Sequence, residues 1–126
     1  MINSFGAMSN FYAQQKQSMV RERYNDIYAH EMAHKSAAGE LGGPIVIERD
    51  SNGIPVGGHV NITMPVLDKN NPENTIKHAD KVIKSAMAPS DPSAQDYRVA
   101  AAAKSVKSQA IAEKNKQSGQ KLNLFA

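Results

Sequence analysis

The residues of this sequence best suited to chemistry are two histidines that flank a glutamate. His30, Glu31 and His34 form an HExxH motif. On a helix, side chains four residues apart project from the same face, so both imidazoles can bind one cation. Glu31 then lies beside the metal, where it can act as general base towards a metal-activated water. The motif predicts a zinc-dependent metallopeptidase that hydrolyses bonds of a peptide or protein substrate.

The third metal ligand has to come from elsewhere in the chain, because a catalytic zinc needs three protein ligands and an open position. The sequence has no cysteine and only four histidines, so the candidates are few. We favour His59, which follows Gly57 and Gly58 on a predicted strand. Glycines in a strand indicate the close approach of another backbone, here that of the metal-binding helix. His78 lies among lysines and is expected to be a solvated surface residue.

Three carboxylates remain as alternative third ligands, namely Asp91, Asp96 and Glu40. Helix capping or surface exposure is the simpler role for each, and Ser93 with Asp96 has the spacing of a capping box. A fourth protein ligand such as Asp96 would close the site and make the zinc structural. The alternative to an enzyme is therefore a non-catalytic, zinc-stabilised binding or scaffold module.

A long N-terminal helix is expected to carry the motif. From Ser9 or Asn10 to Ala38 the chain has no proline and no internal glycine, and Gly39 is placed to end a helix. The HExxH motif then lies in the last two turns of this helix.

A β-hairpin is expected to follow. Residues 45–48 predict its first strand, Asn52 and Gly53 predict a type I′ turn, and residues 56–64 predict the returning strand. Apolar and polar side chains alternate in the second half of the returning strand, which places His59 on its polar face.

Two further helices complete the predicted order. The first begins at Asn71 and Pro72 and is stopped by Pro89, and the second is capped near Ser93 and continues to about residue 116.

The chain of 126 residues fits one domain. We expect a minimal, zincin-like α+β domain over residues 9–116, with flexible ends at residues 1–8 and 117–126. Aromatic residues make up only 6% and tryptophan is absent, so the core is thin and a bound metal would matter for stability.

Composition also bears on location and partners. No stretch is apolar enough for a membrane span, and the first twenty residues lack the features of a secretory signal, so the expected location is cytoplasmic. Export without a cleaved signal would leave no such trace. Residues 104–126 hold five lysines and one acid. No aromatic side chain interleaves with these lysines, so we interpret them as a solvated helix end and do not expect a nucleic-acid partner.

Beyond the HExxH motif, the sequence resembles the SprA-related family of bacterial proteins regarded as metalloproteases. The matching segments are residues 28–34, 37–39, 56–58, 74–76 and 88–96, and together they span roughly residues 20–115. The last segment reads Ala-Pro-Ser-Asp-Pro-Ser-Ala-Gln-Asp and is much more particular than an HExxH.

The resemblance implies a metal-dependent peptidase in which His30 and His34 bind the metal and Glu31 is the general base. The family pattern usually has glutamate at the position of His59, as in Gly-Gly-Glu-Val. Glutamate and histidine both bind zinc, so this departure implies a site of three histidines and leaves a different third ligand open.

Overall fold

The computed structural model describes residues 4–124, and the predicted order of helix, hairpin, helix and helix is confirmed. The elements are α1 (Ser4–Ala38), a short 3₁₀ turn η1 (Gly39–Leu41), β1 (Gly42–Arg49), β2 (Pro55–Ile62), α2 (Pro72–Ala86) and α3 (Ala94–Leu124). The protein is a small α+β domain whose one sheet, in the described residues, is the antiparallel pair β1–β2.

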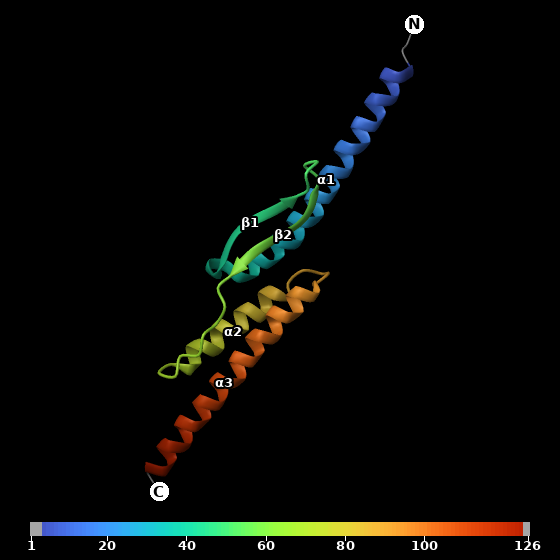
Figure 1. The fold of residues 1–126 in the computed structure, drawn as a ribbon. Helices are drawn as coiled ribbons and strands as arrows, with labels where there is room; N and C mark the ends of the chain where they lie inside the picture. Colours follow the sequence, from blue (N-terminus) through green and yellow to red (C-terminus); the bar gives the residue numbers. More distant parts are fainter. Residues whose placement is uncertain (1–3, 125–126) are drawn as a thin grey trace.

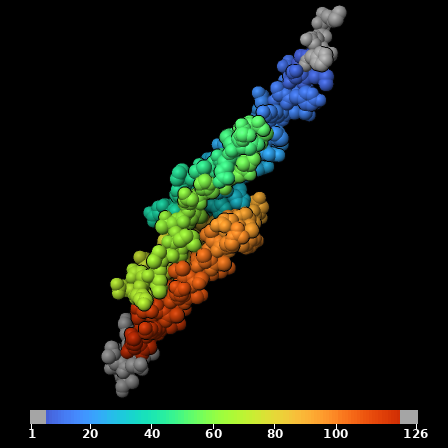
Figure 2. All heavy atoms as spheres, in the orientation of Figure 1, coloured from blue at the N-terminus to red at the C-terminus, as the bar shows by residue number. Residues whose placement is uncertain are grey.

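The molecule is elongated and consists of two packed halves (Figure 1). In the first half the β-hairpin lies along the C-terminal part of α1, and in the second half α2 and α3 form an antiparallel pair. The halves meet where the end of α1 contacts α2. The space-filling view shows the N-terminal part of α1 and the C-terminal part of α3 projecting from opposite ends (Figure 2). Residues 6–18 of α1 are accordingly exposed.

Both long helices extend further than the sequence pattern predicts. α1 begins at Ser4, and α3 continues to Leu124. Of the ends expected to be flexible, residues 4–8 and 117–124 are thus helical, whereas residues 1–3 and 125–126 lie outside the described part of the chain.

Local signals explain where the shorter elements begin and end. Gly39 has a φ of +57°, in the left-handed region that favours glycine, and ends α1 as predicted. The Asn71 side chain accepts a hydrogen bond from the amide of Asn74 at 3.2 Å, which caps α2 immediately before Pro72.

The prediction of a type I′ turn in the hairpin is wrong. Such a turn needs positive φ at both central residues, but among the described residues only glycines have positive φ, and Gly53 is one of them at +78°. Residues 50–54 join the strands, and the amide of Asp50 donates to the carbonyl of Ile54 at 2.9 Å, which closes the loop. The Asp50 carboxylate accepts from the amides of Asn52 and Ile54 and so stabilises the loop from within.

The core is built mainly from alanine. Ala79 and Val82 of α2 and Ala103 of α3 are fully buried, which lets the two helices approach closely. Lys107 pairs with Asp80 at 2.7 Å, and Lys114 pairs with Glu73 at 2.9 Å, across the same helix pair. These two members of the lysine-rich segment therefore contact acids of the same chain.

No helix in the described part of the chain combines the length and the hydropathy that a membrane span requires.

The hairpin lies close to α1 at Gly58. A Cβ atom at this position would lie 2.7 Å from Cγ2 of Ile27 and 3.1 Å from Cγ of Glu31. β2 thus comes close to α1 as expected, but at Gly58 it meets side chains of the helix, including the glutamate of the HExxH motif, and not the helix backbone.

We expect the substitution Gly58→Ala to lower the free energy of unfolding by about 1–3 kcal/mol, because the added methyl group has to push β2 away from α1. Gly57→Ala is the matched control, since the nearest neighbour of its added Cβ atom would be the flexible Glu48 carboxylate at 3.4 Å and the expected change is within about 0.5 kcal/mol. Urea unfolding followed by circular dichroism measures both. Equal losses at the two positions would contradict a close contact specific to Gly58.

Candidate metal centre

The HExxH motif lies in the C-terminal part of α1, as predicted, and faces the second half of the molecule. Glu31 and His34 are buried, with 6% and 5% of their surface exposed, and His30 is half-buried. The two imidazole rings are neighbours on one face of the helix, with Nε2 atoms 3.2 Å apart.

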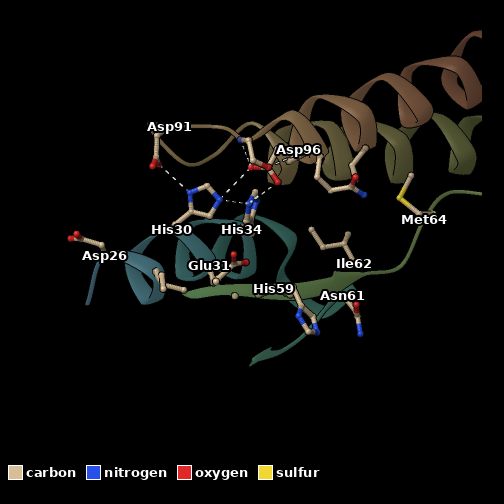
Figure 3. A pocket seen from close by; sticks show the side chains of 18 residues that line it. Asp26, His30, Glu31, His34, His59, Asn61, Ile62, Met64, Asp91 and Asp96 are labelled. Atoms are coloured by element: carbon tan, nitrogen blue, oxygen red, sulfur yellow. Dashed lines mark hydrogen bonds and ion pairs between the residues drawn. The ribbon is translucent and has the colours of Figure 1, made fainter. Parts of the chain in front are cut away.

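A carboxylate that could be a third ligand reaches this pair from the first turn of α3. The Asp96 carboxylate lies 3.3 Å from Nε2 of His30 through Oδ2 and 3.2 Å from Nε2 of His34 through Oδ1 (Figure 3). Asp96 also forms the predicted capping box, in which Oδ2 accepts from the amide of Ser93 at 2.8 Å and the Asp96 amide donates to the Ser93 hydroxyl at 3.1 Å. The helix cap therefore fixes the orientation of the carboxylate.

The other ring nitrogen of each histidine has a partner that orients the ring. His34 Nδ1 donates to the carbonyl of Ser85 at 2.8 Å, and His30 Nδ1 lies 3.0 Å from Oδ1 of Asp91. A carbonyl oxygen only accepts, so the proton of neutral His34 is on Nδ1 and the Nε2 lone pair is free for a metal. The carboxylate of Asp91 favours the same tautomer in His30. Metal-binding histidines in proteins are held in this way.

The distances in this cluster fit a metal ion. Ligand atoms placed tetrahedrally at about 2.0–2.1 Å from zinc are about 3.3–3.4 Å from each other. The two histidine nitrogens are 3.2 Å apart, and each lies 3.2–3.3 Å from a different oxygen of the Asp96 carboxylate, which is close to that value. In the described part of the chain, His30, His34 and Asp96 are the one group of three such residues near enough to share an ion.

The structure does not bring His59 to this group. Its Nδ1 atom lies 2.9 Å from Oε1 of Glu48, and 46% of its side chain is exposed. Side chains alternate along a strand, so because Gly58 faces α1, His59 has to face the other way. Asp96, one of the alternatives from the sequence, occupies the place expected for His59.

The remaining candidates have other surroundings. Asp91 contacts the ring of His30 from the side opposite to Asp96, and Glu40 is exposed in η1. His78 is half-buried and donates from Nε2 to the carbonyl of Thr63 at 2.7 Å. Sequence reasoning did not identify Ser85, whose fully buried side chain also donates to the carbonyl of His34 at 2.7 Å. The one signal for it is a serine inside the apolar stripe of α2.

Burial and neighbouring charges shift the pKa values of Glu31, His30 and Asp91. Burial raises the pKa of the Glu31 carboxyl, and the positive charges of His34 and His30 oppose that rise. Burial would lower the pKa of His30, but the hydrogen bond to Asp91 and the nearby acids outweigh it, so that pKa is raised. The hydrogen bond to His30 lowers the pKa of Asp91. A bound cation would favour ionised Glu31 and neutral imidazoles.

The cluster opens into a cavity of about 610 Å³, which is within the usual range for ligand pockets. Its walls come from α1, from β2 and the segment after it, from the end of α2 and from the start of α3. Glu31, the two histidines and Asp96 all line it. A ligand in this cavity can therefore reach both the metal candidates and the glutamate.

We expect the wild-type chain to bind one zinc ion, and Asp96→Asn to weaken binding by more than about 100-fold, since the amide keeps the helix cap but loses the negative charge. Asp91→Asn, which alters only the orientation of His30, is expected to weaken binding about 10- to 100-fold. Competition with a chromophoric chelator measures these affinities.

His59→Ala is the control and should leave the zinc affinity unchanged. Retained binding in Asp96→Asn together with loss in His59→Ala would contradict the assignment and return the third ligand to the hairpin.

The comparisons with known proteins identify a family. The sequence model of the SprA-related family matches residues 6–122, which is nearly the whole chain. No curated protein and no solved structure matches the chain. On the extent of this match, the chain belongs to the SprA-related family.

Proposed function

We propose that the protein is a zinc-dependent metallopeptidase that hydrolyses peptide bonds. The observation that carries the proposal is the convergence of His30, His34 and Asp96 beside the buried Glu31, at the wall of an open cavity. Each group required for hydrolysis has a candidate in this arrangement.

The donor set favours zinc over other ions. Two imidazoles and one carboxylate suit zinc, and three protein ligands are the usual number at a catalytic zinc. The group found in the described residues has three members, which supports an open site. When bound there, zinc would polarise a peptide carbonyl and lower the pKa of a water at its open position towards about 7.

Glu31 is the proposed general base and acid. It is next to His30 in sequence, lies outside the ligand group and lines the cavity. In this role its carboxylate takes a proton from the attacking water and delivers it to the amine that leaves. Gly58 of β2 covers its stem, which limits access of bulk water from the hairpin side.

The strand β2 is the proposed support for the peptide. Every residue from Gly57 to Ile62 lines the cavity, although alternate side chains of a strand point to opposite faces. Continuous lining of this kind indicates that the cavity runs along the strand's edge. β2 pairs with β1 on its other edge, so an extended peptide can pair with the main chain of the free edge.

We expect Glu31→Gln to bind zinc with nearly unchanged affinity and to lose about 10²- to 10⁴-fold in the rate of peptide hydrolysis, because the amide cannot accept the proton. Cleavage of a mixed peptide library, followed by mass spectrometry, provides the rates. Glu22→Gln is the matched control, since Glu22 is exposed on the same helix and should retain full activity.

Undiminished hydrolysis by Glu31→Gln would remove Glu31 from the mechanism. The scaffold alternative is supported by one observation, namely that the ligand candidates come from both halves of the molecule and an ion would join them. If zinc-loaded wild-type protein cleaves no peptide of the library, that result would favour the scaffold alternative.

A further inference from the structure

The cavity at the metal centre has two chemically different ends. One end is lined by His30, Glu31 and Asp91, and the other continues to Ile62 and Met64, which lie on the far side of the cluster from Asp91 (Figure 3). Val99 follows Asp96 by one turn of α3 and also lines the cavity.

The apolar end is open to a ligand. Met64 is 37% exposed, and Ile62 and Val99 are each half-buried although they face a cavity between elements. Ala86, which adds to this lining from the end of α2, is only 2% exposed and forms part of the floor. Apolar side chains left partly uncovered inside a concave site are typical of a subsite that a ligand covers.

We propose that this apolar end, formed by Ile62, Met64, Ala86 and Val99, is a specificity subsite for a large aliphatic or aromatic side chain next to the cleaved bond. The inference rests on the proposed function and adds the substrate class to it, namely peptides with such a residue at the cleavage site.

The position of the subsite along β2 supports this occupant. A peptide paired with the strand advances about 3.3 Å per residue, with successive side chains on opposite faces. Ala86 follows Ser85, which contacts His34, and Val99 follows Asp96 by one turn of α3. The apolar end therefore begins beside the cluster, where a side chain next to a bound carbonyl can reach it, and it continues along β2 towards Ile62 and Met64. These aliphatic side chains offer no partner to a charged group, which would lose its hydration there without compensation.

Binding to inactive protein tests the subsite without turnover. Zinc-loaded Glu31→Gln is titrated by NMR with acetyl-glycyl-Xaa-amide peptides in which Xaa is glycine, leucine, phenylalanine or lysine. We expect leucine and phenylalanine to bind at least about tenfold more tightly than glycine, as the burial of about two methylene groups provides, and lysine to gain nothing.

A second substitution locates the preference. Met64→Asn in the same background should reduce the advantage of leucine over glycine to less than about threefold. Val66→Asn is the matched control, because Val66 is apolar, two residues further along the same segment, 80% exposed and not part of the cavity lining. It should leave the preference unchanged. Val99→Phe fills the subsite from the opposite wall and should reduce the binding of phenylalanine most.

Three results would each overturn the subsite. They are equal affinities for all four peptides, no binding of any peptide, and equal effects of Met64→Asn and Val66→Asn. Failure of the proposed function has a different signature: wild-type protein that binds the peptides with the expected preference and cleaves none of them. Cleavage of library peptides without any apolar preference would refute the subsite and leave the peptidase intact.

Discussion

Two imidazole nitrogens and a carboxylate meet at one point, and the rest of the structure holds them there. The Nε2 atoms of His30 and His34 are 3.2 Å apart, and each Nδ1 atom is already engaged. Two lone pairs at that distance repel each other unless a proton or a cation lies between them, and Asp96 adds negative charge beside them. The surrounding fold has to supply the free energy that keeps such a group assembled, and a cation would relieve its repulsion.

That support comes from contacts that also join the halves of the molecule. The fully buried core side chains are small, so they allow close packing but bury little apolar area. His34 and Ser85 exchange two hydrogen bonds, ring to carbonyl at 2.8 Å and hydroxyl to carbonyl at 2.7 Å, and thereby link α1 to α2. Asp96 links α1 to α3 in the same region. The candidate site and the junction between the halves are thus formed by the same residues.

Much of this arrangement follows from local sequence signals, and the parts that do not follow depend on packing between distant segments. The HExxH helix, its end at Gly39 and the capping box at Asp96 are each set by neighbouring residues. The sequence offers Asp96 as an alternative ligand but gives no reason to prefer it to His59, because the cap alone accounts for an acid at that position. The glycines before residue 59 indicated a close approach, but Gly58 itself makes the contact, so the next side chain points away.

The candidate ligands and the partners of their Nδ1 atoms come from the three helices and the segment before α3, and β2 contributes none of them. A change of residue 59 therefore need not alter the candidate ligand set. His59 contacts Glu48 on the outer face of the hairpin, where a glutamate would instead meet a like charge. The substitution therefore bears on the stability of the hairpin. Because β2 provides no candidate ligand, its free edge remains available along the cavity. That edge lies next to Glu31, which β2 can approach closely because residue 58 is a glycine.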